Sequence, residues 1–387
     1  METTRIVIVG AGLSGLYAAY LLEQQGIGDY VLLEARARPG GRIMSASRAG
    51  APGPMGVGAS NNVNRFDLGP TWFWPDLQPR LDRLVRRLGL ERFAQHETGD
   101  MLVERVSNEP PMRMRGYAAL PRSMRLVGGM GALTDALQRS LPTARLAIGK
   151  QVRQIRRTQT HVELDAGDSE GQVTTYRAEL VLLAVPPRLA VATIEFAPAL
   201  PDALQRSWND TATWMAPHAK YLAVYDTPFW RERGLSGEAR STCGPLVEIH
   251  DASMPGGDAA LFGFVGMSAQ ARKRLSYDEL CNRCREQLTR MFGSQALRPR
   301  EEIIKDWAED PLTATESDQN GGAGHPAAPA ARAESGVWRD ALIGIASEWS
   351  LQFPGYVAGA IDAASMGVSA VLGLASFDAI SAHRRCN

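Results

Sequence analysis

Three glycines near the amino terminus have the spacing of a phosphate-binding turn. Gly10, Gly12 and Gly15 follow the β-branched run at 6–9, which is typical of a strand buried on both faces. The first glycine permits a tight turn, the second lets the backbone approach a pyrophosphate, and the third lets the following helix pack closely. Because the start of that helix attracts phosphate charge, the spacing predicts a dinucleotide site.

An acid and two arginines extend this pattern. Glu34 ends a second predicted strand, 30–33, at about the twenty-residue interval where an acid takes the ribose hydroxyls. Arg36 and Arg42 then flank a Gly-Gly turn and could make charge-assisted contacts with phosphates. Solvated arginines on a turn are the alternative. The order of strand, glycines, helix, strand and acid favours a dinucleotide site over a purely structural turn.

The composition excludes several classes of function. The 387 residues include 42 basic and 42 acidic side chains, so no net field favours nucleic acid or an anionic membrane. No uncharged run reaches the ~18 residues of a membrane span, and no signal peptide is evident. Cys281 and Cys284 have a metal or redox spacing, but they lie in a predicted helix without a second Cys or His pair. We expect reduced, partly buried thiols, no metal site and a cytoplasmic location.

The elements that must position these residues alternate along the chain, whose length allows about two or three domains' worth of core. We expect loops over 44–64 and 321–333, an amphipathic helix over 77–90 and a last helix ending near 380, with a frayed tail beyond it. Strands are predicted at 146–155, 160–164, 180–185, 246–250, 260–265 and 342–348.

One lysine stands on a predicted strand. The stretch 214–225 carries Lys220 and is followed by Pro228-Phe229-Trp230. A lysine on such a strand usually lies at an edge with its ammonium in water. His218 would share the face of Lys220 if the strand is regular, although a structural role is favoured for it.

Together these motifs resemble those of the FAD-dependent amine oxidases and their relatives, which include monoamine, polyamine and L-amino-acid oxidases. The glycine spacing, Glu34 and the R-x-G-G-R element at 38–42 are similar to the amino-terminal fingerprint of that family. Residues 66–75, 126–133, 184–187, 303–311 and 354–360 resemble its later motifs in the same order. The resemblance covers nearly the whole chain, except the loops near 44–64 and 316–336.

The resemblance also implies roles for single residues. In many relatives a strand lysine followed by P-F-W holds a water against flavin N5, and Lys220 matches that position. Tyr356 matches a tyrosine of the aromatic cage at the start of the last helix, whose positive end would face the flavin. Trp72, by its place after Gly69, is predicted on the substrate side, and Phe73 and Trp74 in the core.

The chain departs from the family in one segment. Glu316 and Ser317 stand where relatives often have Ala or Cys followed by Tyr. No cysteine is present there for a covalent flavin link, so we expect FAD to be held non-covalently. Ser317 also cannot supply the second aromatic wall of the cage.

The resemblance implies an α/β fold with a discontinuous Rossmann-type FAD-binding domain (1–76, 125–208 and 305–387). It also implies an α+β substrate domain built on a mixed sheet (77–124 and 209–304). The predicted catalytic residues are Lys220 and Tyr356, and the predicted substrate-cavity residues are Trp72, Ser317 and His218. The predicted cofactor-binding residues are Gly10, Gly12, Leu13, Ser14, Gly15, Glu34, Ala35, Arg36, Gly40, Gly41, Arg42, Gly69, Pro70, Thr71, Val152, Trp307, Glu348, Tyr356 and Val357.

The implied reaction is loss of a hydride from the α-carbon of a small-molecule amine to flavin N5. The imine would be hydrolysed to an aldehyde or ketone, and O₂, the expected acceptor, would be reduced to H₂O₂. No base for the amine proton is evident, so a neutral amine in an apolar pocket is the simplest scheme. Alternatives are an L-amino-acid oxidase or amine dehydrogenase of the same superfamily, or a degenerate flavin-binding protein. We expect no nucleic-acid or membrane partner and leave a homodimer open.

Overall fold

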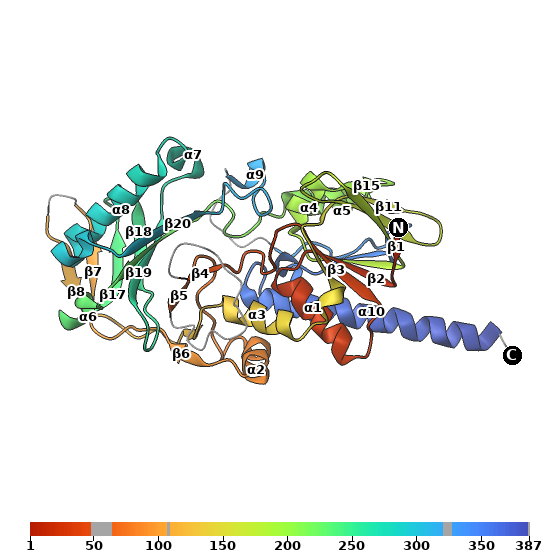
Figure 1. The fold of residues 1–387 in the computed structure, drawn as a ribbon, viewed down its shortest axis with the longest axis horizontal. Coiled ribbons are helices and arrows are strands. Elements are labelled where there is room, and N and C mark those ends of the chain that lie inside the picture. The colour runs from red at the N-terminus through yellow and green to blue at the C-terminus, as the bar shows by residue number, and fades with distance from the viewer. Residues whose placement is uncertain (48–63, 107–108, 320–326, 386–387) are drawn as a thin grey trace. The chain divides into compact units, whose positions relative to one another are not determined.

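The computed structural model describes residues 1–47, 64–106, 109–319 and 327–385, which belong to two compact units (Figure 1). Unit 1 comprises Met1–Gly41, Thr134–Trp214 and Gly322–Asn387, and unit 2 comprises Arg42–Leu133 and Met215–Gly321. From the sequence we placed 42–76, 125–133 and 305–321 with the cofactor domain. They are grouped instead with unit 2, where Ala46, Phe66 and Leu68 pack against Leu222 and Val224. Which segments serve the cofactor stays a prediction.

A five-stranded, fully parallel sheet forms the centre of unit 1. Its order is β10 (Leu146–Ile148), β3 (Tyr30–Glu34), β2 (Ile6–Val9), β14 (Leu180–Leu183) and β21 (Leu342–Gly344). All residues of β2, β14 and β21 are buried, as expected for strands covered on both faces. Helix α1 (Leu13–Gln24) follows β2 and packs against α10 (Val357–Arg385). This confirms the predicted Rossmann-type architecture.

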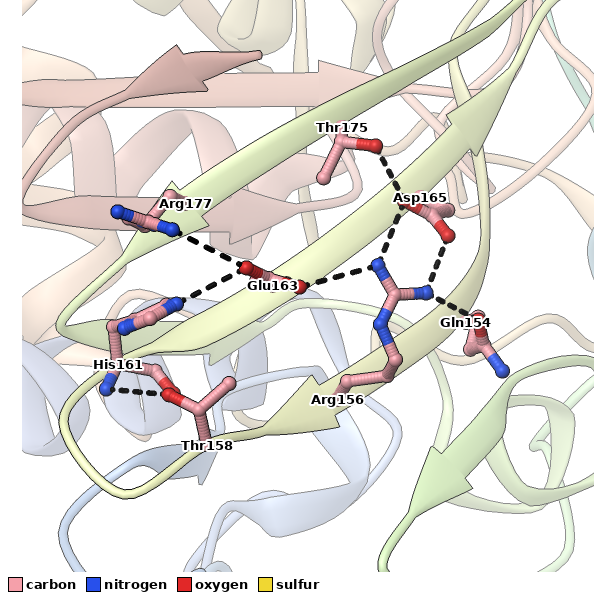
Figure 2. Close-up of polar contacts among 8 residues, drawn as sticks. All are labelled: Gln154, Arg156, Thr158, His161, Glu163, Asp165, Thr175 and Arg177. Carbon is pink, nitrogen blue, oxygen red and sulfur yellow. Dashed lines mark hydrogen bonds and ion pairs between the residues drawn. The ribbon is translucent and has the colours of Figure 1, made fainter.

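A second sheet completes unit 1. Its order is β1 (Glu2–Thr3), β13 (Val173–Ala178), β12 (Val162–Gly167), β11 (Gln151–Arg157) and β15 (Glu195–Ala197). One face is apolar and buried, while the other bears the polar network in Figure 2. There Arg156 bonds to Asp165 and to Glu163, and Thr175 donates to Asp165 at 2.7 Å. The charges on this face are therefore paired across the strands.

One predicted strand is divided between these two sheets. We expected 146–155 to be a single antiparallel strand, but β10 pairs in parallel with β3 and β11 joins the second sheet. The chain turns between them at Gly149, which has φ +72°. A glycine takes that conformation without steric cost, and it is what separates the two strands.

Helix α10 reaches further along the chain than we predicted. Its last residue is Arg385, so most of the tail that we expected to fray is helical. Among the described residues, the window Val357–Leu374 is long and apolar enough to cross a membrane by length and composition, and 56% of it is buried. Within the window, Asp362 accepts a hydrogen bond of 2.8 Å from Ser350 Oγ. Packing against α1 and β21 accounts for the apolar character of the helix.

A seven-stranded mixed sheet is the frame of unit 2. Its order is β20 (Glu301–Asp306), β16 (Ala219–Tyr225), β19 (Ala259–Val265), β18 (Leu246–Asp251), β17 (Leu235–Ser241), β7 (Asp100–Glu104) and β8 (Met112–Met114). Helix α8 (Tyr277–Phe292) packs on one face, where Cys281 and Cys284 are buried free thiols. This confirms the predicted helix and thiol state. The other face carries Lys220.

The remaining elements are short. They are β4 (Ser45–Ser47), β5 (Arg65–Asp67), α2 (Pro79–Arg87), β6 (Arg92–Ala94), β9 (Met124–Leu126), α3 (Gly131–Arg139), α4 (Pro187–Thr193), α5 (Asp202–Asp210), α6 (Phe229–Glu232), α7 (Ala269–Arg272) and α9 (Glu316–Gln319). Short 3₁₀ turns lie at Thr143–Arg145, Ser294–Leu297 and Ser347–Trp349.

Two predicted loops are only partly described. In the 44–64 stretch, β4 pairs with β5 instead of forming a loop, and 48–63 lies outside the described residues. In the 321–333 stretch, 327–333 has neither helix nor strand, as predicted, and 321–326 lies outside the described residues. The last strand is also shorter than expected, because the chain enters a 3₁₀ turn at Ser347.

Candidate functional site

The glycine turn of unit 1 has the backbone that phosphate binding requires. Gly10 has φ +100°, and its N–H donates to Leu33 O at 2.8 Å. A Cβ on Gly15 would stand 1.9 Å from Gly10 O, so no larger residue fits there. Helix α1 begins after Gly12 without a side-chain cap, which leaves its positive end for an anion. Leu13 and Ser14, also predicted to bind cofactor, are the buried first residues of this helix.

Glu34 connects the end of β3 to this turn. Its side chain accepts hydrogen bonds of 2.8 Å from the N–H groups of Ala11 and Arg36. The residue is 4% exposed. Burial raises the pKa of its carboxyl group, whereas the hydrogen bonds from these N–H groups lower that pKa. Each carboxylate oxygen keeps a second lone pair for a hydroxyl donor. The position suits the ribose contact predicted for it.

The Gly-Gly turn lies directly against the glycine turn. Gly40 N donates to Ala11 O at 2.9 Å, and Gly12 and Gly40 form a parallel bridge. Gly41 has φ +58°, and a Cβ on it would lie 3.2 Å from the Gly12 Cα. The backbone of the Gly-Gly turn therefore passes close to the backbone at Gly12. Of the other residues predicted in this stretch, Ala35, Arg36 and Arg42 are partly buried.

The carboxy-terminal residues predicted for the cofactor also lie in unit 1. Glu348 is fully buried in a 3₁₀ turn and accepts a hydrogen bond of 3.0 Å from Ser347 Oγ. Tyr356 is 38% exposed and immediately precedes Val357, the first residue of α10. The side chain of Val152 is buried in the core through β11. Tyr356 is therefore available to a ligand, and its cage role stays a prediction.

Lys220 is a buried lysine on the face of the unit 2 sheet opposite α8, where Phe66 and Leu68 pack against Leu222. It is 2% exposed, and its Nζ donates to Thr71 Oγ1 at 2.6 Å and to Gly69 O at 3.1 Å. Nζ also lies 3.9 Å from the centroid of the Phe262 ring. Lys220 is therefore not a typical edge lysine whose ammonium group lies in water. Residues 69–71, predicted as a cofactor segment, hold the amine.

Burial changes the acid–base properties of this lysine. Desolvation lowers the pKa of Lys220 to about 7, with Arg125 acting in the same direction and Asp67 opposing. An uncharged amine is a base, so a lysine that titrates near neutrality can accept a proton. The base that we could not identify from the sequence is thus available in Lys220.

Aromatic side chains surround the lysine on the same face. Register places Lys220 opposite Phe264 and Phe264 opposite Glu248, so all three side chains share one face. Trp72 lies 5.4 Å from Phe262 and 4.8 Å from His250, centroid to centroid, and its Nε1 donates to Gln95 at 2.8 Å. This face combines apolar rings with a few polar groups, as binding surfaces for small molecules do.

The neighbouring aromatics of Trp72 differ in burial. Phe73 is fully buried, as predicted, whereas Trp74 is partly exposed and does not belong to the core. Trp72 is also partly exposed, which agrees with a side chain that can meet a ligand. Its substrate role stays a prediction.

Two further predicted residues of unit 2, His218 and Trp307, adjoin the ends of β16 and β20, and a third, Ser317, lies on α9. Trp307 is buried, and its Nε1 donates to Leu68 O at 3.0 Å. His218 precedes the first residue of β16, so the regular-strand reasoning does not apply to it; its carbonyl accepts from Trp307 N at 3.0 Å. Ser317 is exposed on α9. No group of three or more His, Cys, Asp or Glu within the described ranges could hold a metal.

Two charged residues near Lys220 escaped the sequence reasoning. Asp67 is 4% exposed and Arg125 1% exposed, and each contributes to the electrostatics of Lys220. Asp67 begins the D-x-G segment, which offered a signal that we did not use. Arg125 belongs to the short strand β9 and follows no motif, so nothing in the sequence indicated it.

Fold and site together define a dinucleotide-binding oxidoreductase with a Rossmann-type unit and a mixed-sheet unit. A model described as flavin containing amine oxidoreductase matches residues 111–372, and one described as an NAD(P)-binding Rossmann-like domain matches 8–88. The chain belongs to the flavin-containing amine oxidoreductase family.

Individual relatives agree with this assignment. The chain is 24% identical to the flavin-containing amine oxidase B of Sus scrofa, over 80% of this chain and 75% of the relative. It is 30% identical to the probable flavin-containing monoamine oxidase A of Dictyostelium discoideum, over 48% of this chain and 40% of the relative. A solved putrescine oxidase bound to putrescine superposes with a TM-score of 0.76 at 20% identity, covering 96% of this chain and 99% of that one. That likeness confirms the fold.

The family name implies FAD, and the unit 1 turn fits it. The diphosphate of FAD would suit the uncapped start of α1 and the close backbone at Gly12 and Gly41. The ribose hydroxyls would suit the carboxylate of Glu34. The glycine spacing, the acid and the Gly-Gly turn predicted this site from the sequence, and its contacts with FAD stay a prediction.

Proposed function

We propose that this protein oxidises small-molecule amines with FAD as its cofactor. The observation that carries the proposal is Lys220, a lysine buried on an aromatic sheet face and held at Nζ by Thr71 and Gly69. Family membership supports the reaction class. FAD, when bound, accepts a hydride from the carbon next to the amine nitrogen.

The chain's own residues bind, orient and exchange protons. The turn at Gly10–Gly15 and the carboxylate of Glu34 hold the adenosine diphosphate part, and Arg36 neutralises phosphate charge. Trp72, Phe262 and Phe264 provide the apolar surface that excludes water and favours a neutral amine. Lys220 Nζ holds or accepts a proton, because its uncharged form is accessible near neutral pH.

We also propose that FAD is bound non-covalently. The support is local: Glu316 and Ser317 occupy the positions where a cysteine would form the link, and Cys281 and Cys284 are buried in the packing of α8. Acid precipitation tests this directly. All of the yellow chromophore should remain in the supernatant, and colour in the washed pellet would show a covalent link.

A substrate screen in air tests the main proposal. The purified flavoprotein is mixed with primary, secondary and cyclic amines, α,ω-diamines and L-amino acids, and peroxide is measured by a coupled dye. Putrescine belongs in the panel because one relative was solved with it bound. Peroxide formed with an amine supports the proposal. Peroxide formed with L-amino acids alone would favour an amino-acid oxidase. Absence of peroxide with all compounds would favour a dehydrogenase or a degenerate protein.

We further propose a cytoplasmic location and no membrane partner. The support is the balanced charge, 42 basic against 42 acidic side chains, together with buried reduced thiols in α8. Fractionation of cells that express the full chain would test both statements. Recovery of the protein in the washed membrane pellet would contradict them.

A further inference from the structure

Three groups of unit 2 contact the amine of Lys220. Gly69 O and Thr71 Oγ1 accept hydrogen bonds from Nζ, at 3.1 and 2.6 Å, and Nζ lies 3.9 Å from the centroid of the Phe262 ring. The Phe264 ring is more distant, with its centroid 5.8 Å from Nζ. We call Gly69, Thr71 and Phe262 the lysine cradle.

The cradle offers one partner for each donor of an ammonium group. A protonated lysine has three N–H donors and no acceptor. Two of these donors meet oxygens, and the third can face the negative π surface of Phe262, which attracts a cation over distances of up to ~6 Å. The cradle therefore complements the charged form of the lysine.

The uncharged form fits the same three groups less well. An uncharged amine has two N–H donors and a lone pair, and neither the Gly69 carbonyl nor a ring face can donate to that lone pair. The Thr71 hydroxyl can donate to it, but a hydrogen bond to an ionised group is roughly twice as strong as a neutral one. Loss of the proton thus weakens the contacts of Nζ with its cradle.

Both side chains of the cradle are held in place by packing. Thr71 is 4% exposed and Phe262 is 1% exposed. The Phe264 ring stands edge-on to Phe262, with centroids 5.5 Å apart and planes at 87°, and Trp72 lies 5.4 Å from Phe262. The ring that faces Nζ is therefore fixed from two sides.

Burial opposes the effect of the cradle. Lys220 is 2% exposed, and desolvation lowers its pKa, since a buried ammonium loses its hydration. Burial alone favours an uncharged lysine, whereas the cradle favours a charged one. A residue that both accepts and returns a proton needs these two effects to be nearly balanced.

We propose that Thr71 and Phe262 are positioning residues that keep Lys220 in exchange between its charged and uncharged forms. Thr71 accepts a hydrogen bond from the ammonium, and Phe262 presents its ring face to it. The inference rests on the proposed function, in which Lys220 accepts a proton, but its contacts involve no substrate. It gives Thr71, predicted from the sequence as a cofactor residue, a role at the lysine.

In the described part of the chain, no titratable group on the surrounding elements hydrogen-bonds to Nζ. Lys305 on β20 and Glu248 on β18 lie in the same row of the sheet, and each is bonded to another side chain. Asp67 on β5 and Arg125 on β9 are buried charges of opposite sign, and His218 lies just before β16. All five stay unaltered in variants of the cradle, so a change between variants reports the cradle itself.

The lysine content makes a direct test practical. The chain has four lysines, at 150, 220, 273 and 305, so protein labelled with ¹³Cε-lysine gives four NMR signals to follow with pH. The signal that disappears in Lys220→Met belongs to Lys220. The titration is recorded on the full-length flavoprotein, and circular dichroism and flavin absorbance check that each variant is folded and loaded.

Removal of either contact should lower the Lys220 midpoint. Thr71→Val keeps the shape of the side chain but removes the hydroxyl, and Phe262→Leu keeps an apolar side chain but removes the ring. We expect each to lower the midpoint by about one pH unit. Thr71→Ser, which restores the hydroxyl, should stay within about half a pH unit of the wild type. Phe264→Leu is the matched control for the ring and should cause a smaller shift.

Each outcome decides about a named residue. An unchanged or raised midpoint in Thr71→Val, or a lowered midpoint that Thr71→Ser does not restore, would overturn the role of Thr71. An unchanged or raised midpoint in Phe262→Leu, or an equal shift in Phe264→Leu, would overturn that of Phe262. If Phe262→Leu does not fold, the comparison of Thr71→Val with Thr71→Ser decides the proposal.

The pH profile of flavin reduction separates this proposal from the proposed function. Its acid limb should move to lower pH in Thr71→Val by the amount that the NMR midpoint moves, and Thr71→Ser should restore it. A purely structural role of Thr71 would lower the rate at all pH values without this displacement, and would overturn the proposal. If the midpoints move as expected while no amine reduces the flavin, the cradle is supported and the amine-oxidase proposal is contradicted.

Discussion

Lys220 Nζ donates a 2.6 Å hydrogen bond to Thr71 Oγ1, a residue 149 positions earlier in the chain. The bond joins β16, an inner strand of the unit 2 sheet, to the segment that follows β5. It fixes the direction of an amine that burial holds close to its uncharged form. A lysine so placed can exchange a proton without moving, as the proposed oxidation of amines requires.

Removing this amine should slow catalysis severely. Lys220→Met keeps the length of the side chain but removes the proton-exchanging group and its charge. We expect flavin reduction or reoxidation to fall by ~100-fold or more, the range seen when a preorganised polar group is lost from a reaction site. Stopped-flow absorbance measures both half-reactions.

The control for Lys220→Met is Lys273→Met. Lys273 bonds Gln319 at the surface, far along the chain from the lysine strand, and its loss should leave both rates within about twofold. Equal rates for Lys220→Met and the wild type would remove Lys220 from the reaction.

Stability should also depend on pH through Lys220. Its pKa is about 7 when folded and about 10.5 when unfolded, so between these values the unfolded chain binds more protons. The free energy of unfolding of the wild type should therefore rise relative to Lys220→Met from about pH 7 to about 10.5. The slope is at most about 1.4 kcal/mol per pH unit. Urea unfolding of both proteins measures the difference, and a pH-independent difference would show that Lys220 titrates normally.

The glycine turn should tolerate no side chain at Gly15. A Cβ there would stand 1.9 Å from Gly10 O, so Gly15→Ala must displace backbone that forms the phosphate-binding turn. We expect loss of bound FAD, measured by the ratio of flavin to protein absorbance after gel filtration. Gly373→Ala in α10, where nothing lies within 4 Å of the built Cβ, should keep full flavin content. A fully loaded Gly15→Ala protein would contradict the proposed FAD site.

The polar network of Figure 2 should make a small, pH-dependent contribution to stability. Hydrogen bonding to Arg156 lowers the pKa of Asp165, and hydrogen bonding to His161 lowers that of Glu163. Their stabilisation is complete above the unfolded pKa of ~4 and is lost as pH falls through the lower folded values. Asp165→Asn should cost about 1 kcal/mol or less at pH 7, since the group is partly exposed.

That network can be tested by comparing two pH values. In urea unfolding, the difference in the free energy of unfolding between Asp165→Asn and the wild type should become smaller at pH 3 and in high salt. A gap that stays constant across pH would mean that packing, not charge, is what Asp165 provides.

Much of unit 1 was predictable because its signals are local. Strand, glycines, helix and acid lie within 34 consecutive residues, and each constrains backbone that is close in sequence. The Rossmann-type fold of unit 1 and the start of α1 followed from them, and the start of α10 followed from the turn predicted at 354–356. The division of 146–155 between two sheets did not, since pairing partners are chosen by tertiary packing and the hydrophobic pattern does not specify them.

The environment of Lys220 was less predictable. Resemblance to the family singled out the lysine, but its burial and its bonds to Thr71 and Gly69 depend on segments about 150 residues away. Asp67 and Arg125 lie on β5 and β9, far from Lys220 in the sequence, and no periodicity or spacing relates them to it. The prediction that Trp74 lies in the core was wrong for the same reason. The alternation of side chains along a strand does not determine which of three consecutive aromatic residues remains exposed.

The central claim is that this chain oxidises amines. Anaerobic titration tests it most directly, because it isolates electron transfer from the choice of acceptor. We predict that at least one amine will bleach the flavin band near ~450 nm, with a rate that rises as pH passes through the ionisation of the substrate. If no amine in a broad panel reduces the flavin while dithionite does, the protein binds flavin without oxidising amines, and the account is wrong.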